Sequence, residues 1–115
     1  LFRSARAMGC EAEVETRLLT RSVVNHPEVT KRVRKIARDL YPDAVLDERF
    51  QTMGSEDMSF FMQDIPGCFI FVGSANEKEG RNAPHHHPKF DIDEKALTIG
   101  AGLIASVAAS YLQTE

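Results

Sequence analysis

Residues 68–72, Cys-Phe-Ile-Phe-Val, are the stretch that most restricts how this chain can fold. The run is apolar at every position, and it lies between Pro66-Gly67 and Gly73, which are residue types that favour turns. A strand that is apolar throughout is typical of a sheet covered by helices on both faces. We therefore expect these residues to form a buried strand in an α/β protein.

The segments around this run predict alternating strands and helices. Strands are expected at residues 10–18, where apolar residues and glutamates alternate, and at residues 44–53. Helices are expected at four places, which are residues 1–8, 27–40, 58–63 and about 94–112. Pro27 suits a first helical position, and Asp91 or Asp93 suits the cap of the last helix. This order of elements predicts an α/β fold.

The composition is that of a soluble globular protein, with 43% apolar and 27% charged residues. A formal net charge of −3 and the lack of a basic stripe give no reason to expect nucleic acid. The longest apolar run, residues 99–112, is interrupted by glycine and serine and is shorter than a membrane span, so no membrane is expected. Cys10 and Cys68 suit buried thiols better than a disulfide framework, and no signal peptide is visible. We therefore expect a cytoplasmic protein.

Three histidines, His85, His86 and His87, stand in a row between Pro84 and Pro88. Proline fixes one backbone dihedral and keeps the residue before it extended, so a stiff, non-helical loop is expected. Neutral imidazole is the commonest metal ligand in proteins and the usual acid–base group near pH 7. The run therefore indicates either a site for chemistry or an ordinary solvated loop, and the residues alone favour neither.

A second polar feature is the turn at Ser55, Glu56 and Asp57, ahead of a short predicted helix. Acidic residues at a helix start usually cap it, although such a turn can also present polar groups to a ligand. A catalytic zinc ion takes three protein ligands, and two-metal sites take more. Adjacent histidines in extended backbone point to opposite sides, so at most two of them can bind one ion. The residues alone therefore do not make a complete metal site.

Three motifs nevertheless occur in order along the chain. They are residues 54–59 (Gly-Ser-Glu-Asp-Met-Ser), residues 65–67 (Ile-Pro-Gly) before the apolar run, and residues 85–91 (His-His-His-Pro-Lys-Phe-Asp) before the final helix. This series resembles the C-terminal part of the metal-dependent amidohydrolases related to hippurate hydrolase, aminoacylase, plant auxin-conjugate hydrolases and carboxypeptidase G. The resemblance covers essentially the whole chain.

The resemblance implies a partial zinc-exopeptidase-like catalytic domain of sheet and helices, into which a smaller, often dimerising domain is inserted. Residues 1–24 are then the last helix and strand of the inserted domain. Residues 25–115 are the C-terminal segment of the catalytic domain. The chain is accordingly expected to be part of a longer amidohydrolase, to be inactive alone, and to form a homo-oligomer.

The resemblance also implies roles for single residues. His86 occupies the position that ligates one metal ion of a two-metal centre, although the triplet leaves a register shifted by one residue open. His85 and His87 are then supporting residues of the loop, and Glu56 and Asp57 lie at the rim, structural or facing the substrate. The other ligands and the general-base glutamate belong to an N-terminal segment that resembles nothing in this chain, so no catalytic residue is expected here.

The implied parent enzyme hydrolyses the amide bond of an N-acyl amino acid or a small peptide. It uses two divalent metal ions, which can be zinc, manganese, cobalt or nickel. Two other classes stay open on the sequence. One is a non-catalytic binding or dimerisation module, and the other is a histidine-loop protein that stores or senses metal.

Overall fold

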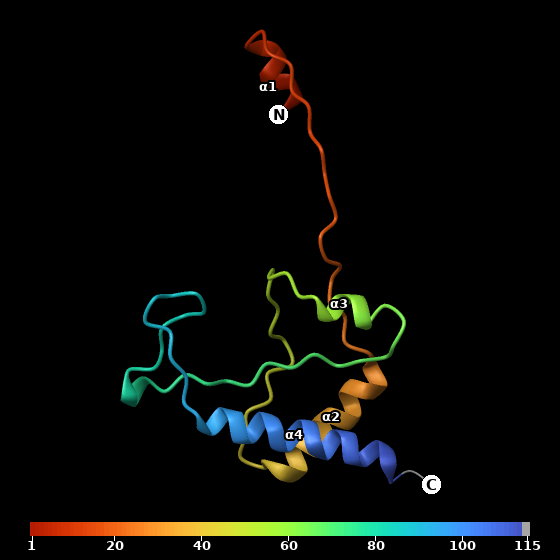
Figure 1. The fold of residues 1–115 in the computed structure, drawn as a ribbon, viewed down its shortest axis with the longest axis vertical. Coiled ribbons are helices and arrows are strands. Elements are labelled where there is room, and N and C mark those ends of the chain that lie inside the picture. The colour runs from red at the N-terminus through yellow and green to blue at the C-terminus, as the bar shows by residue number, and fades with distance from the viewer. Residues whose placement is uncertain (114–115) are drawn as a thin grey trace.

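Helices make up the regular secondary structure in the computed structural model of the chain, which describes residues 1–113. They are α1 (Phe2–Ala7), α2 (Pro27–Leu40), α3 (Met58–Phe61), the 3-10 helix η1 (Glu77–Glu79) and α4 (Lys95–Leu112), as Figure 1 shows. The four predicted helices are thus confirmed with ends that differ by a residue or two. The short helix η1 was not predicted.

Helices α2 and α4 cross and pack on each other, and they supply the buried apolar side chains of the described residues (Figure 1). From α2 come Val33 and Ala37, which lie four residues apart and so share one helix face. From α4 come Ala96 and Leu103. Beside this contact the hydroxyl of Tyr41 donates a hydrogen bond to the carbonyl of Ile99 at 3.2 Å. The loop that precedes α4 is therefore attached directly to this helix pair.

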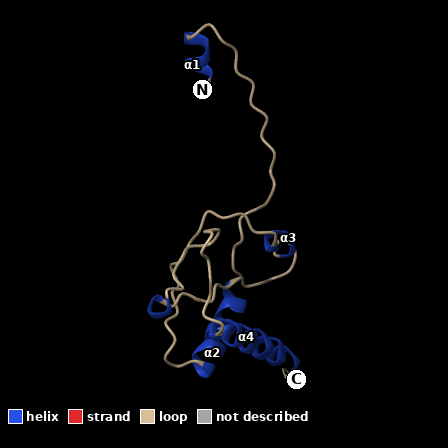
Figure 2. Ribbon diagram, turned by 60° about the vertical axis from the view of Figure 1, so that its left-hand side comes forward, coloured by secondary structure: helices blue, strands red, loops and turns tan. Residues whose placement is uncertain are grey.

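The three predicted strands, at residues 10–18, 44–53 and 68–72, are not formed within residues 1–113 (Figure 2). The ladder contact found there is an isolated antiparallel bridge between Asn76 and Arg81. A strand is stable only when a neighbour pairs with its backbone N–H and C=O groups, and these three segments do not pair with one another. The α/β prediction is therefore corrected: the described residues form a mostly helical, extended chain.

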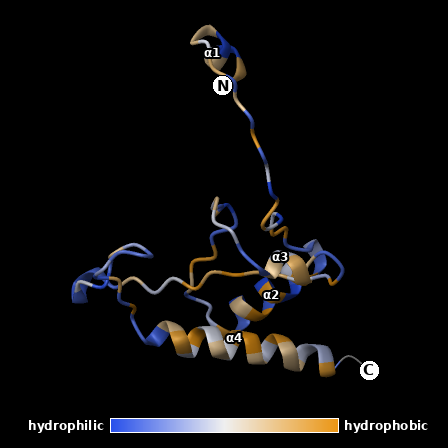
Figure 3. Cartoon of the chain, turned by 45° about the horizontal axis from the view of Figure 1, so that its top comes forward, coloured by the Kyte–Doolittle hydropathy of each residue, from blue (hydrophilic) through white to orange (hydrophobic). Residues whose placement is uncertain are grey.

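The described chain is also open in shape. Its radius of gyration is 20.2 Å, whereas a compact domain of this length has about 13 Å. Its accessible surface of 10339 Å² likewise exceeds the ~6300 Å² of a folded monomer of this mass. Large apolar side chains consequently lie in water along the extended segments, where Figure 3 shows hydrophobic stretches outside the helix pair. The chain does not bury the apolar residues of its predicted strands.

Helix α1 and an extended arm, residues 10–24, project away from the helix pair (Figure 1). Gly9 has φ +71° and ends α1, as predicted for a glycine just past a helix. Both cysteines are free, but Cys10 is exposed on this arm and Cys68 is half-buried. The predicted buried environment is therefore wrong for Cys10, because the arm has no second layer to cover it.

Asn25 fastens the base of the arm to the apolar run. Its side-chain amide donates to the carbonyl of Phe69 at 2.8 Å, and its side-chain oxygen accepts from the Phe69 N–H at 2.8 Å. The N–H of His26, the N-cap of α2, donates to the carbonyl of Gly67 at 2.9 Å. The start of α2 is thereby held against the segment that enters residues 68–72.

Helix α4 has 18 residues and is long and apolar enough, by length and composition, to cross a membrane. The expectation of no span considers only residues 99–112, whereas the helix begins at Lys95. Core helices of soluble proteins meet the same criterion, but they are mostly buried, whereas α4 packs on α2 and leaves most of its surface exposed. Its side chains Leu97 and Ile104 are exposed. Length and composition therefore do not assign α4 to a membrane.

We expect the purified 115-residue chain to self-associate. Ile70, Phe71 and Val72 have no backbone hydrogen bond within residues 1–113, and Phe71 is 62% exposed. Unpaired extended backbone with apolar side chains readily pairs with another copy. Sedimentation velocity should show dimers or larger species, and Phe71→Lys should shift them toward monomer. The control Met8→Lys, at an exposed apolar position whose backbone N–H is already hydrogen-bonded, should not. A chain that stays monomeric at high concentration would contradict this expectation.

Candidate functional site

The three histidines lie in a loop of residues 82–90, called here the histidine loop. Two consecutive β-turns that share His87 build its tip. In the first turn the N–H of His87 donates to the carbonyl of Pro84 at 3.1 Å, and in the second the N–H of Phe90 donates to the carbonyl of His87 at 2.8 Å. Pro88 holds the second position of the second turn, which its fixed φ suits. The predicted non-helical loop is confirmed, but its backbone turns where an extended course was expected.

His86 has the unusual backbone conformation of this loop. Its φ is +66°, the one positive value at a non-glycine residue within residues 1–113. It is the third residue of the first turn, a position that requires positive φ in a type II turn and is usually glycine or asparagine. This conformation costs a non-glycine residue about 1–2 kcal/mol. Strained residues of this kind cluster at functional sites, so the presence of histidine here indicates a role for its side chain.

His85 and His87 are each engaged inside the loop. The ring of His85 meets the ring of Phe90 edge-on at a centroid distance of 4.9 Å, and it lies 5.0 Å from the ring of His86. The Nδ1 atom of His87 accepts a hydrogen bond from the N–H of Lys89 at 3.1 Å. All three histidines are exposed, and the described residues make no hydrogen bond to the imidazole of His86. The three neighbours therefore differ in their local roles.

Side chains from both flanks join the two ends of the histidine loop. Nε of Arg81 lies 3.2 Å from Oδ2 of Asp91, and Nη1 of Arg81 donates to the carbonyl of Ile92 at 3.2 Å. Further out, the side-chain amide of Asn76 donates to Oδ2 of Asp93 at 2.8 Å. Two pairs of side chains, Arg81 with Asp91 and Asn76 with Asp93, therefore hold the two ends of the loop together, and this joined region is called the base of the loop.

Asp93 connects this base to the start of α4. Its Oδ1 accepts from the N–H of Lys95 at 3.1 Å, while Glu94 occupies the N-cap position without a side-chain bond. The hydrogen bonds from Asn76 and from the Lys95 N–H hold the pKa of the Asp93 carboxyl below its usual value. The expected cap is thus corrected in position: Asp93 satisfies an orphan N–H from one residue before the N-cap.

Glu56 and Asp57 lie at the start of α3, away from the histidine loop; α3 and η1 occupy opposite sides of the body in Figures 1 and 2. Oε1 of Glu56 accepts from the N–H of Met58 at 3.2 Å. Asp57 is the N-cap, and its carbonyl accepts from the N–H of Phe60 at 2.9 Å. Within the described residues both acidic side chains belong to a helix start, and they are not brought together with the histidines.

Within residues 1–113, no three histidine, cysteine or acidic side chains come together as a group able to hold a metal ion. The exposed imidazole of His86 is nevertheless a donor of the type that zinc and similar divalent ions accept. The histidine loop therefore offers an exposed ligand group of this type, but the described residues do not make a metal site among themselves.

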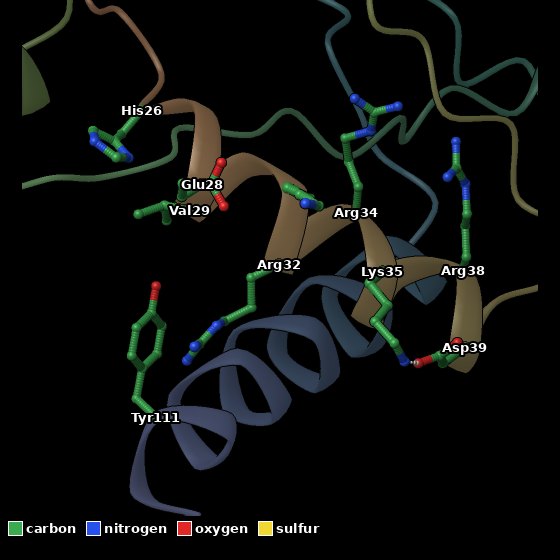
Figure 4. Close-up of a pocket in the computed structure, with 10 residues that line it drawn as sticks. His26, Glu28, Val29, Arg32, Arg34, Lys35, Arg38, Asp39 and Tyr111 are labelled. Atoms are coloured by element: carbon green, nitrogen blue, oxygen red, sulfur yellow. Dashed lines mark hydrogen bonds and ion pairs between the residues drawn. The ribbon is translucent and has the colours of Figure 1, made fainter. Parts of the chain in front are cut away.

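A separate groove follows the basic side of α2 (Figure 4). Its lining includes His26, Arg32, Lys35, Arg38 and Tyr111. The guanidinium of Arg32 lies over the ring of Tyr111 at 4.1 Å, and Lys35 pairs with Asp39 at 2.6 Å. The groove reaches the C-terminal end of α4, whereas the histidine loop precedes its N-terminus, and a helix of 18 residues spans about 27 Å. The groove is therefore not part of the histidine site.

Sequence reasoning missed the residues that close the base of the loop. Asn76 carried a usable signal, because an asparagine three residues before Glu79 matches a helix N-cap. Its Oδ1 does accept from the N–H of Glu79 at 3.3 Å. Arg81 carried no local signal, since its partners Asp91 and Ile92 lie on the far side of the loop.

This chain is similar in sequence to several known proteins. The pattern of Peptidase family M20/M25/M40 matches residues 7–110. The chain is 39% identical over 90 residues to thermostable carboxypeptidase 1 of Saccharolobus solfataricus, covering 78% of this chain and 22% of that protein. It is 39% identical over 92 residues to IAA-amino acid hydrolase ILR1-like 2 of Arabidopsis thaliana, covering 80% of this chain and 21% of that protein. With IAA-amino acid hydrolase ILR1-like 6 of the same plant it shares 34% identity over 119 residues, covering 100% of this chain and 26% of that protein.

The chain therefore spans between a fifth and about a quarter of the length of these relatives. No solved structure matches it significantly. The matched region, residues 7–110, contains the histidine loop, its closed base and the turn at Glu56 and Asp57. The resemblance to metal-dependent hydrolases expected from the three motifs is thus confirmed, and the chain belongs to Peptidase family M20/M25/M40.

Proposed function

We propose that this chain supplies one metal-ligating histidine, His86, to a metal-dependent amidohydrolase. The observation that carries the proposal is the conformation of this residue. A histidine occupies a backbone position with φ +66° that favours glycine, and its imidazole is exposed and makes no hydrogen bond within residues 1–113. A strained position with an unused ligand group is consistent with selection for binding rather than for the turn.

His85 and His87 support the loop in this proposal. The ring of His85 contacts the ring of Phe90 at 4.9 Å, and Nδ1 of His87 accepts a hydrogen bond from the N–H of Lys89. His86 offers a neutral imidazole nitrogen as ligand. Glu56 and Asp57, which lie away from the histidine loop within residues 1–113, are proposed to reach the rim on the substrate side only in the complete domain. The other ligands and the glutamate that acts as general base come from parts of the complete protein outside this chain.

Two divalent ions, when bound, polarise the scissile carbonyl and lower the pKa of a water molecule toward about 7. Zinc, manganese, cobalt and nickel all suit a site with imidazole ligands. The bond that we propose to be hydrolysed is the amide of an N-acyl amino acid or a small peptide. The names of the relatives, carboxypeptidase and IAA-amino acid hydrolase, support an amide next to an amino acid.

The open shape of the chain supports a place within a larger catalytic domain. Residues 25–115 form its C-terminal segment, and residues 68–72 become a strand when neighbours from the rest of the domain pair with them. The exposed side chains Leu97 and Ile104 of α4 then pack against that sheet. Residues 1–24 are the end of an inserted domain through which a cytoplasmic homo-oligomer forms.

The test is an assay of the complete protein against hippurate, N-acetyl amino acids and small peptides. Hydrolysis should disappear on dialysis against a chelator and return with zinc, manganese, cobalt or nickel. A complete protein that binds these metals without hydrolysing any amide would favour a metal-storage or sensing protein. One that neither binds metal nor hydrolyses amides would favour a binding or dimerisation module. Either result would overturn the proposal.

A further inference from the structure

We infer that Arg81 is a positioning residue, which closes the base of the histidine loop and thereby holds His86 where it binds metal. This inference rests on the proposed function, since it acts through His86 as a ligand. It concerns a residue that lies five positions before the ligand and does not itself contact metal or substrate.

The backbone of Arg81 is fixed on the incoming side of the loop. Its N–H donates to the carbonyl of Asn76 at 2.9 Å, and its carbonyl accepts from the N–H of Asn76 at 2.7 Å. These two bonds enclose η1, which is followed by Gly80 in the left-handed conformation with φ +72°. The side chain of Arg81 therefore starts from a defined point.

From that point the guanidinium crosses to the outgoing side. It contacts the Asp91 carboxylate through Nε and the Ile92 carbonyl through Nη1, both at 3.2 Å. A planar guanidinium can serve a carboxylate and a carbonyl together, whereas the ammonium of lysine is a single point charge. The Arg81 side chain is 34% exposed, against 63% for Asp91. Arg81 is thus the less exposed partner and joins the two ends of the loop.

The contribution of this contact to overall stability should be small. Solvent-exposed ion pairs contribute about 0–1 kcal/mol, and the third neighbour, Glu79 at 3.3 Å, is half-exposed. Its effect on the loop should be larger, because none of residues 82–90 is buried and no core packing fixes their place.

Because the backbone of His86 is strained, closure of the base of the loop affects how His86 presents its imidazole. A residue with φ +66° relaxes toward ordinary backbone more readily when the pair at the inner end of the base is lost and only the outer contacts of Asp93 with Asn76 and Ser74 remain. The fraction of molecules that present the imidazole correctly then falls, and the apparent metal affinity falls by the same factor. Loss of Arg81 should therefore weaken metal binding while the fold persists.

The experiment uses the complete enzyme and measures Zn²⁺ affinity by competition with a chromophoric chelator. Arg81→Ala should lower the affinity about 10–100-fold, the usual range for groups that orient a ligand. The thermal midpoint of the metal-free protein should fall no more than it does in the control variant Lys35→Ala, and excess Zn²⁺ should restore kcat. Arg81→Lys should recover part of the affinity. The control Lys35→Ala removes another exposed ion pair, with Asp39 on α2, and should bind Zn²⁺ as the wild type does.

The outcomes separate this inference from the proposal beneath it. If His86→Ala binds Zn²⁺ as tightly as the wild type, the proposed function fails. If His86→Ala loses Zn²⁺ but Arg81→Ala keeps wild-type affinity, the function stands and the positioning role is overturned. If Arg81→Ala lowers the thermal midpoint of the metal-free protein by clearly more than Lys35→Ala does, along with the affinity, Arg81 has a merely structural role, which also overturns the inference.

Discussion

Replacing His86 with alanine in the complete enzyme is expected to remove most of the amidase activity while the fold survives. The residue is exposed, so truncation opens no cavity, and surface changes of this kind usually stay within about 0.5 kcal/mol. Activity, measured as kcat/KM for an N-acyl amino acid, should fall by more than about 100-fold. In His85→Ala and His87→Ala, kcat/KM should fall by only about 10–100-fold, as expected for groups that support a ligand.

A second substitution at the same position separates the imidazole from the backbone. His86→Gly removes the ligand but also relieves the left-handed strain, worth about 1–2 kcal/mol, against roughly 0.5–1 kcal/mol for the added chain flexibility. We therefore expect His86→Gly to unfold at the same temperature as His86→Ala or slightly above it. Both variants should be equally inactive, because both lack the imidazole.

A different order of activities among these variants would change the role assigned to His86. Wild-type activity in His86→Ala together with loss in His85→Ala or His87→Ala would mean that the register is shifted by one residue. Equal, slight effects at all three positions would make the run an ordinary solvated loop. Activity in His86→Gly but not in His86→Ala would assign the effect to the backbone of the turn.

The second large effect concerns the chain by itself. The purified 115-residue chain is expected to show no turnover of hippurate or acetylated amino acids at any added concentration of zinc, manganese, cobalt or nickel. The described residues bring no three potential ligands together, whereas two-metal hydrolysis needs several. Amide hydrolysis followed by release of free amino acid is the measurement.

The complete enzyme under the same buffer and metal conditions is the positive control for this assay. Amidase activity that co-purifies with the isolated chain, and that is lost in the His86→Ala variant of this chain, would overturn the expectation. Such a result would mean that the chain assembles a working site from its own residues or from several copies.

Helices were predictable from local signals, and strands were not. Pro27 at a first helical position and Gly9 after a helix end act within a few residues, and both features occur as expected. The run of residues 68–72 has the composition of a buried strand, but its backbone needs partners from a neighbouring strand. Those partners are not among residues 1–113, so the same composition here gives an extended, exposed segment.

In the candidate site, too, the features set by neighbouring residues could be predicted and the others could not. The two prolines around the histidines fixed the expectation of a non-helical loop, because proline acts on its own residue and the one before it. The left-handed backbone of His86 could not be predicted, since positive φ is uncommon at any non-glycine residue. The role of Arg81 could not be predicted either, because its partners Asp91 and Ile92 lie ten or eleven positions further along the chain and meet it only when the loop closes.

The most direct test of the central claim is the metal content of the purified complete enzyme and its three single alanine variants at His85, His86 and His87. Elemental analysis after removal of loosely bound ions gives the number of metal ions per subunit. We expect the wild type, His85→Ala and His87→Ala to retain two ions, and His86→Ala to lose one. Retention of both ions by His86→Ala would contradict the assignment of His86 as a metal ligand.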